Sequence, residues 1–221
     1  MKNTNENRRE FLKKLSLSSA VLPLLTNCQN SARAQKTTDE TLSAIRKNAL
    51  DPAQHNWCGA SGAPGSVNWR AFLAEKTDAG EPLIISGTVF QKDGATPVPN
   101  VLIYAYHTNA EGFYGRGNGE PQHGKHRGWM LTDACGRYEF QTIKPGSYPS
   151  RDDPAHIHFT LTGADFKEDW IDSIWFEGDA RITPEIRKKQ LTGRGGFNST
   201  VRIEKSAAGI LYGRRDIRLM S

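Results

Sequence analysis

The stretch that decides the fold of this chain is Pro154–Thr162, which reads PAHIHFTLT. From residue 156 onward, polar and apolar residues alternate, which is typical of a β-strand with one buried face. Residues two positions apart in a strand project from the same face. His156 and His158 therefore share one face, the apolar residues share the other, and the pattern predicts a strand over residues 156–162.

Two imidazoles on one strand face can bind a single metal ion, because imidazole is the commonest metal ligand in proteins. A solvated strand face would carry the same pair, so the pair alone leaves both interpretations open. Three further histidines are expected either to face solvent or to be hydrogen-bonded: His107, His123 and His126.

Two tyrosines in neighbouring segments add hard oxygen donors to this pair. Tyr114 lies in a glycine-rich loop over residues 108–128, and Tyr148 stands in a turn between Pro145 and Pro149. A highly charged cation can deprotonate a phenol at neutral pH, as a metal does for a bound water or thiol. A set of two phenolates and two imidazoles favours Fe(III) over Zn(II).

The strand pattern continues along the chain on both sides of this stretch. Short helices are expected over 41–50 and 184–190. Strands are expected over 83–91, 98–107, 129–132, 137–141, 156–162, 174–176, 201–204 and 211–219. Many short strands separated by turn signals predict an all-β sandwich, with long loops that hold the metal.

Length and composition suit one main domain with extensions. The formal net charge of the 221 residues is +5, but six of the 29 Lys and Arg and only two of the 24 Asp and Glu lie in residues 1–34. The rest is nearly neutral and lacks the basic footprint of a nucleic-acid-binding protein. The predicted organisation is an export leader over 1–34, a lead-in over 35–80 with a short helix, and the sandwich over 81–221.

The leader reads Arg-Arg-Glu-Phe-Leu-Lys from Arg8 and continues into an apolar stretch too short to span a bilayer. This order resembles the twin-arginine export signal, so the protein is expected outside the cytoplasm, in the periplasm or at the cell surface. Two processing routes stay open. Cys28 would carry a membrane lipid anchor, which is favoured, or residues 32–34 would form an ordinary cleavage site.

Either route leaves Cys58 and Cys135 in the mature protein. An oxidising compartment permits a disulfide between them. Their distance along the sequence says nothing about geometry, and two independent thiols are the favoured interpretation. The lead-in could pack on its own domain or on a neighbouring copy, which leaves a homo-oligomer open.

Taken together, the motifs resemble those of the intradiol ring-cleavage dioxygenases, the family of protocatechuate 3,4-dioxygenase and the catechol 1,2-dioxygenases. The resemblance extends roughly from Leu83 to Leu219. It rests on Gly112-Phe113-Tyr114, Arg127-Gly128, the run from Thr132 to Pro149, Pro154-Ala155-His156-Ile157-His158-Phe159 and Phe176-Glu177-Gly178-Asp179.

The resemblance implies a prealbumin-like β-sandwich with a non-haem Fe(III) bound by Tyr114, Tyr148, His156 and His158. It implies that a catechol-type aromatic is cleaved by O2 between its two hydroxyls, giving a muconate-type diacid. In the family, the tyrosine matching Tyr148 also leaves the metal when the catechol binds and helps to take up a substrate proton. Tyr148 is therefore expected to be catalytic as well as a ligand.

Two departures from the family pattern concern the substrate pocket. Many members carry an arginine just before Pro-Ala-His, where this chain has Asp153, and a glutamine is common where Ser173 stands. Arg151 is the candidate to supply the missing cation. A carboxylate in place of a cation disfavours a dianionic substrate.

Two other functions compete with the enzyme hypothesis. Residues 87–101 and 132–138 also resemble prealbumin-like modules of surface proteins, which bind ligands or act as spacers, although such modules lack the histidine strand. Alternatively, with Asp153 and Ser173 in the pocket, the protein would bind iron and catechols with little turnover.

Overall fold

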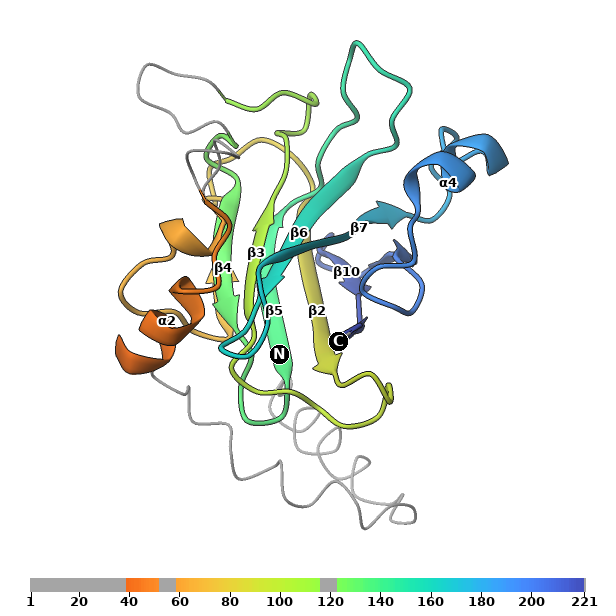
Figure 1. The fold of residues 1–221 in the computed structure, drawn as a ribbon. Helices are drawn as coiled ribbons and strands as arrows, with labels where there is room; N and C mark the ends of the chain where they lie inside the picture. The colour runs from red at the N-terminus through yellow and green to blue at the C-terminus, as the bar shows by residue number, and fades with distance from the viewer. Residues whose placement is uncertain (1–38, 52–58, 116–122, 221) are drawn as a thin grey trace, which may run out of the picture. The chain divides into compact units, whose positions relative to one another are not determined.

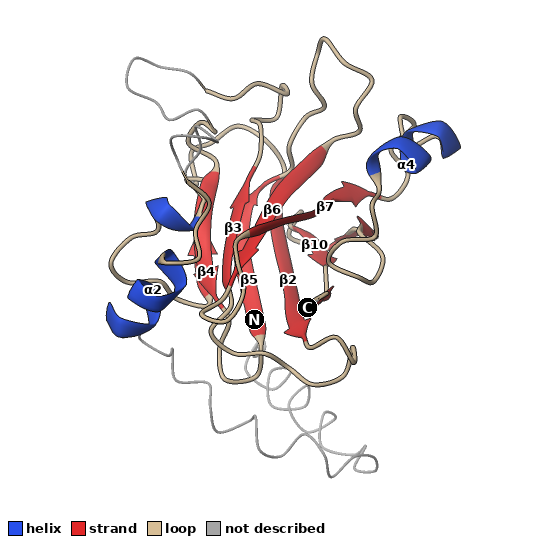
Figure 2. Ribbon diagram, viewed as in Figure 1, coloured by secondary structure: helices blue, strands red, loops and turns tan. Residues whose placement is uncertain are grey.

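The computed structural model describes residues 39–51, 59–115 and 123–220. Two mixed β-sheets pack face to face, which confirms the predicted β-sandwich (Figures 1 and 2). None of the helices in these ranges is long and apolar enough to cross a membrane. The helical elements are α2 (Asp39–Arg46), the short 3-10 helix η2 (Ala60–Gly62) and α4 (Pro184–Gln190).

The first sheet contains β1 (Arg70–Phe72), β2 (Pro82–Phe90), β5 (Arg137–Ile143), β9 (Glu204–Lys205), β10 (Leu211–Arg214) and β11 (Ile217–Arg218). Its order is β1-β5-β2-β10-β9, and β11 also pairs with β2. β2 runs antiparallel to β5, whereas β1 is parallel to β5 and β10 is parallel to β2.

The second sheet contains β3 (Leu102–Tyr106), β4 (Arg127–Leu131), β6 (His156–Thr162), β7 (Asp169–Phe176) and β8 (Thr200–Val201). Its order is β4-β3-β6-β7-β8. The histidine strand β6 is therefore central, with antiparallel partners on both sides. A central strand is held by ladder hydrogen bonds along both edges, so it is a rigid support for a functional site.

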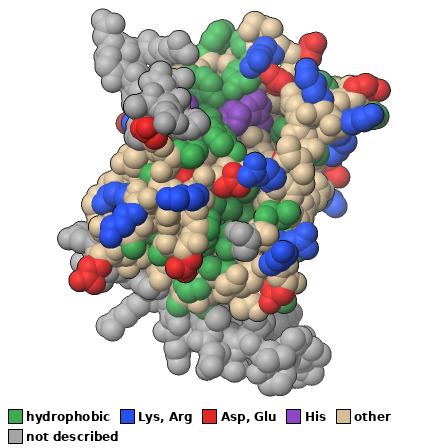
Figure 3. All heavy atoms as spheres, in the orientation of Figure 1, with side chains coloured by type: hydrophobic (Ala, Val, Ile, Leu, Met, Phe, Trp, Pro, Cys, Tyr) green, Lys and Arg blue, Asp and Glu red, His purple; other side chains and the backbone are tan. Residues whose placement is uncertain are grey.

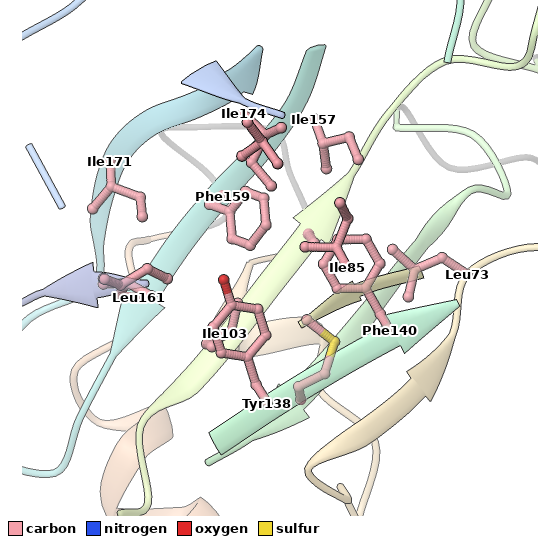
Figure 4. Packing of buried hydrophobic residues seen from close by; sticks show 14 of the residues in the cluster. Leu73, Ile85, Ile103, Tyr138, Phe140, Ile157, Phe159, Leu161, Ile171 and Ile174 are labelled. Atoms are coloured by element: carbon pink, nitrogen blue, oxygen red, sulfur yellow. The ribbon is translucent and has the colours of Figure 1, made fainter. Parts of the chain in front are cut away.

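The main core fills the space between the sheets (Figure 4). On β6, Ile157, Phe159 and Leu161 are buried, as the alternation predicts. Phe159 packs against Tyr138 and Phe140 of β5, with ring centroids 6.4 and 5.9 Å apart. Full burial of one such side chain stabilises the fold by roughly 1.5–3 kcal/mol, so this face fixes the register of β6.

The described part of the lead-in packs on its own sandwich. Leu42 and Ile45 of α2 are fully buried in a second cluster with Leu102 and Leu131. In Figure 1, α2 lies beside β4. The lead-in also supplies β1, so the first sheet begins before the predicted start at residue 81. β1 is only three residues long, and its one large apolar side chain, Phe72, is 74% exposed, so the sequence carries no apolar pattern that predicts the strand.

Several strand boundaries differ from the prediction for local reasons. The strand expected over 98–107 begins at Leu102, because Pro99 cannot donate a ladder hydrogen bond and Asn100 has φ 59°. The strand expected over 201–204 separates into β8 and β9, which lie in different sheets. Likewise, the strand expected over 211–219 separates into β10 and β11.

Helix α4 has the predicted bounds. The Thr183 hydroxyl accepts a hydrogen bond from the Ile186 amide, and Pro184 occupies the first turn, where its missing N–H is harmless. Cys135 is buried in the turn before β5. The leader, Cys28 and Cys58 lie outside the described residues, so the export signal, the lipid anchor and the cysteine pairing stay predictions.

Candidate metal centre

Four polar side chains converge beside β6, on the side turned away from the core. The hydroxyl oxygens of Tyr114 and Tyr148 are 2.9 Å apart. The Tyr148 hydroxyl lies 3.3 Å from the Nε2 atoms of His156 and His158, and these two Nε2 atoms are 3.0 Å apart. The fold thus brings together all four residues expected as ligands, which we call the Tyr–His cluster.

Hydrogen bonds at the other nitrogen of each imidazole orient the rings. Nδ1 of His156 lies 2.6 Å from the carbonyl oxygen of Pro154. A carbonyl can only accept, so Nδ1 carries the proton and the Nε2 lone pair points into the cluster. Nδ1 of His158 lies 3.1 Å from the Ser173 hydroxyl. Such hydrogen bonds select the tautomer and hold the ring of a metal-binding histidine.

Ser173 reaches His158 because the pairing of β6 with β7 is irregular. The register shifts between Ile157 and Phe159, so that Asp172 and Ser173 of β7 stand opposite the single His158. A β-bulge bends a strand and re-aims its side chains, and bulges are frequent beside active sites.

Two glycines allow the loops that carry the tyrosines to pack backbone to backbone. Gly112 has φ 87°, and a Cβ atom there would lie 1.9 Å from the carbonyl oxygen of Ser147. A Cβ on Gly146 would lie 2.3 Å from the carbonyl oxygen of Ala110. The Gly146 amide donates to the Asn109 carbonyl oxygen at 2.9 Å. Neither glycine has room for a side chain, so this contact sets the spacing of the two phenols.

Burial favours the uncharged form of all four groups. It raises the pKa of Tyr148, which the hydrogen bond from Tyr114 partly opposes, and it also raises the pKa of Tyr114. It lowers the pKa of His156 and brings that of His158 well below its usual value. Neutral imidazoles are ready to bind a metal, and a bound cation would offset the loss of the phenolic protons.

Aromatic side chains surround the cluster. Tyr106 stacks on His158 with centroids 4.7 Å apart, and Trp170 meets the same ring edge-on at 6.0 Å. His123 stacks on Tyr106 at 3.8 Å, and its Nδ1 lies 2.9 Å from the Tyr104 hydroxyl. This packing limits the rotation of His158.

His107, His123 and His126, which lie outside the cluster in the described ranges, are buried and hydrogen-bonded, which confirms one of the two expectations for them. Nε2 of His107 lies 2.6 Å from the Thr142 hydroxyl, and Nε2 of His126 lies 3.2 Å from Asp78. Burial lowers the pKa of His107 to about 3 and that of His123 to about 4.

A cavity of about 180 Å³ lies beside the Tyr–His cluster. Histidine side chains reach the molecular surface on the face shown in Figure 3. Arg151 lines this cavity, but its side chain is 68% exposed, and its Nε atom lies 3.5 Å from Oδ2 of Asp153. The cavity is lined by Tyr148, Arg151, Asp153, His156, His158, Ser173, Trp175, Gln190 and Leu191.

Sequence reasoning missed Gln190 as a lining residue. Gln190 ends helix α4 and donates a hydrogen bond from Nε2 to Oδ1 of Asp153. No local pattern signals this contact, because the two residues are 37 positions apart and α4 shows only the pattern of a solvated helix.

The donor geometry fits one metal ion. Two ligands about 2.1 Å from a common ion and at right angles lie about 3.0 Å apart, which matches the spacings within the cluster. Within the described ranges, no group of three or more His, Cys, Asp or Glu side chains could hold a metal, so a site here depends on the phenols. This mixed donor set suits Fe(III).

The family profile described as "Dioxygenase" matches residues 61–197, more than half of the chain. The protocatechuate 3,4-dioxygenase beta chain of Burkholderia cepacia is 33% identical over 141 residues, which cover 55% of this chain and 59% of that protein. Catechol 1,2-dioxygenase of Acinetobacter baylyi is 33% identical over 120 residues, covering 46% and 38%. The chain therefore matches less than two thirds of the length of each of these relatives.

Solved structures show the same fold. The dioxygenase domain of a dioxygenase carbohydrate-binding protein fusion from Streptomyces sp. SirexAA-E superposes with a TM-score of 0.52 at 25% identity, covering 67% of this chain and 85% of that domain. Catechol 1,2-dioxygenase from Pseudomonas arvilla C-1 gives a TM-score of 0.56 at 21% identity, covering 72% and 58%. The family profile, the curated relatives and the fold agree, and the chain belongs to the intradiol ring-cleavage dioxygenase family.

Proposed function

We propose that this protein is an exported, Fe(III)-dependent intradiol dioxygenase that cleaves a catechol-type ring between its two hydroxyls with O2. The observation that carries the proposal is the convergence of Tyr114, Tyr148, His156 and His158: the Tyr148 hydroxyl lies 2.9–3.3 Å from the donor atoms of the other three, and the two Nε2 atoms are 3.0 Å apart. Membership of a family that generally depends on non-haem iron(III) supports the same conclusion.

Bound Fe(III) would supply the electronic activation of the catechol toward O2. The protein supplies orientation and proton handling. The Nδ1 hydrogen bonds to Pro154 and Ser173 aim the two Nε2 atoms at one point. The cavity of about 180 Å³ beside the cluster is lined by Tyr148, so a planar ring bound there would have its hydroxyls near the Tyr148 side chain.

Tyr148 is the side chain best placed to hold a substrate proton. Its hydroxyl contacts three other members of the cluster, and its residue also lines the cavity. Burial raises the pKa of Tyr148, so a Tyr148 oxygen that had bound a cation as phenolate and was then released would readily take a proton from a catechol hydroxyl. Tyr148→Phe removes both a donor of the cluster and the proton acceptor, so iron content should fall and any iron-loaded fraction should cleave the ring more slowly than the wild type.

The test is the visible absorption spectrum of protein from iron-supplemented cells, recorded before and after addition of catechol, together with O2 uptake and product analysis. We expect a broad tyrosinate-to-Fe(III) band that shifts with catechol, with one O2 consumed per ring opened. A protein that stays colourless after reconstitution with Fe(III) would contradict the proposal and favour a binding or spacer module.

A second candidate, catechol binding with little turnover, is favoured by one observation. Asp153 lines the cavity, at a position where many family members carry an arginine. A colour change with catechol that is not followed by O2 uptake would select this candidate over the enzyme.

Export is proposed from the paired arginines of the leader. Replacement of Arg8 and Arg9 by lysine should retain the protein in the cytoplasm, which cell fractionation would detect. Cys28→Ser should release the exported protein from the membrane fraction if Cys28 carries a lipid. An unchanged distribution in both variants would contradict the export route and the anchor.

A further inference from the structure

The cavity beside the Tyr–His cluster has a second polar wall, which the proposed reaction does not use. Asp153 precedes the histidine strand, and Gln190 ends helix α4. Both residues line the cavity together with Tyr148, His156 and His158. Its volume of about 180 Å³ suits one aromatic ring with a small substituent, since an engineered cavity of about 150 Å³ binds benzene.

The hydrogen bond between the two side chains defines what this wall offers a ligand. The Nε2 of Gln190 donates to Oδ1 of Asp153. The amide nitrogen is thereby turned toward the carboxylate, which leaves the Gln190 carbonyl oxygen and Oδ2 of Asp153 as hydrogen-bond acceptors. A wall with two acceptors complements a ligand group that donates hydrogen bonds.

Arg151 does not neutralise the hydrogen-bond-accepting character that Asp153 and Gln190 give this wall. Its Nε atom is 3.5 Å from Oδ2 of Asp153, and its side chain is 68% exposed whereas that of Asp153 is 21% exposed. An exposed ion pair of this kind contributes little and is screened by salt. The carboxylate is therefore the better-buried charge at this wall.

We propose that Asp153 and Gln190 form a subsite for the ring substituent of the substrate, and that it selects catechols whose substituent donates hydrogen bonds. Hydroxyl and ammonium groups satisfy this condition, and a carboxylate group does not. This inference rests on the proposed function, because it assumes that a catechol occupies the cavity. It makes Asp153 a specificity-determining residue.

The experiment measures kcat/KM of the iron-loaded protein for four compounds: catechol, 3,4-dihydroxybenzoate, benzene-1,2,4-triol and 4-(2-aminoethyl)catechol. Their Kd values are measured by calorimetry in parallel, which does not depend on turnover. We expect the triol or the amine to be preferred over the benzoate by at least tenfold in both quantities. Preference for the triol would assign the selection to hydrogen bonding, and preference for the amine would assign it to charge.

Variants separate the contribution of each side chain. Asp153→Asn keeps an oxygen that accepts from Gln190, removes the charge and replaces the second acceptor oxygen by an NH2 donor, so the ratio between amine and benzoate should fall at least tenfold. Arg151→Gln is the matched control, which should leave that ratio within about twofold.

Two results would overturn the inference. One is a wild-type preference for the benzoate, and its loss in Arg151→Gln would identify Arg151 as the selecting residue. The other is a ratio that Asp153→Asn does not change. Failure of the proposed function has a different signature, namely binding in the predicted order without ring opening.

Discussion

The two faces of the seven-residue strand β6 have different functions, and different contacts determine which side chains each face needs. The inner face, Ile157, Phe159 and Leu161, is buried in the core and needs only apolar side chains of the right size. The outer face, which includes His156 and His158, meets tyrosines from two loops. One face is specified by strand periodicity, and the other by contacts between segments distant in the sequence.

This difference predicts that substitutions on the inner face mainly change the stability of the fold, whereas substitutions on the outer face mainly change metal binding. Damage to the inner face should lower the free energy of unfolding and leave the donor geometry intact in the molecules that remain folded. Damage to the outer face should remove the metal and leave the sandwich folded, because the core lies on the other side of the sheet.

The largest effect is expected for His158→Ala, which removes one of the four donors of the Tyr–His cluster. Loss of a group that only orients a ligand typically costs 10–100-fold in metal affinity, so loss of a ligand should exceed that range and abolish iron loading. The iron content of purified protein, by elemental analysis, is the measurement. Circular dichroism should still show a folded β protein.

Tyr106→Phe is the matched control for this substitution. It keeps the ring that stacks on His158 at 4.7 Å and removes a phenol that is not part of the cluster. Iron content and the tyrosinate band should both survive in this variant. Full iron loading of His158→Ala would show that His158 is not a metal ligand, and it would contradict the assignment of metal binding to the outer face.

On the inner face, Phe159→Ala should lower the free energy of unfolding by about 3–5 kcal/mol, because it leaves a cavity between the two sheets. Urea unfolding measures the loss, and the iron content of the folded fraction should stay near that of the wild type. Phe72→Ala is the control: this side chain is 74% exposed, so the change should stay within about 0.5 kcal/mol. Equal losses would contradict the assignment of Phe159 to the core.

The contrast between the two faces of β6 also explains which features of the protein its sequence could predict. The alternation in β6 predicted its bounds and its buried face, because a period of two is a local property. The fold brings together the four cluster residues, but their selection depended on a resemblance to a family. The contact of Gln190 with Asp153 and the bulge at Ser173 had no local signal, because each depends on the position of a neighbouring element.

Substitution of Ser173 tests how much β7 contributes to the orientation of His158. Ser173→Ala removes the partner of His158 Nδ1, which lies 3.1 Å away, and should weaken iron binding 10–100-fold without unfolding the protein. Ser173→Thr keeps a hydroxyl and should restore much of the affinity. Competition with an iron chelator measures both variants. An unchanged affinity in Ser173→Ala would mean that packing by Tyr106 and Trp170 alone orients His158.

The smallest effect concerns a histidine on the inner side of the second sheet. His107 directly follows β3, and by strand alternation its side chain is on the same inner side as Ile103 and Ala105. Its Nε2 atom contacts Thr142 of the opposite sheet. Burial lowers its pKa to about 3, below the value near 6.5 of an unfolded chain. Between these values the unfolded state binds more protons, so the contribution of His107 to stability is complete above pH 6.5 and falls as the pH decreases.

At pH 5.5, one unit below the unfolded pKa, His107 should lower the free energy of unfolding by about 1.4 kcal/mol relative to neutral pH. The other buried histidines act in the same direction, so the measurement is a difference. Urea unfolding of wild-type protein and of His107→Gln is compared at pH 7.5 and pH 5.5. The variant should lose about 1.4 kcal/mol less than the wild type on acidification. Equal losses would show that His107 accepts a proton in the folded protein about as readily as in the unfolded chain, which would contradict its burial between the two sheets.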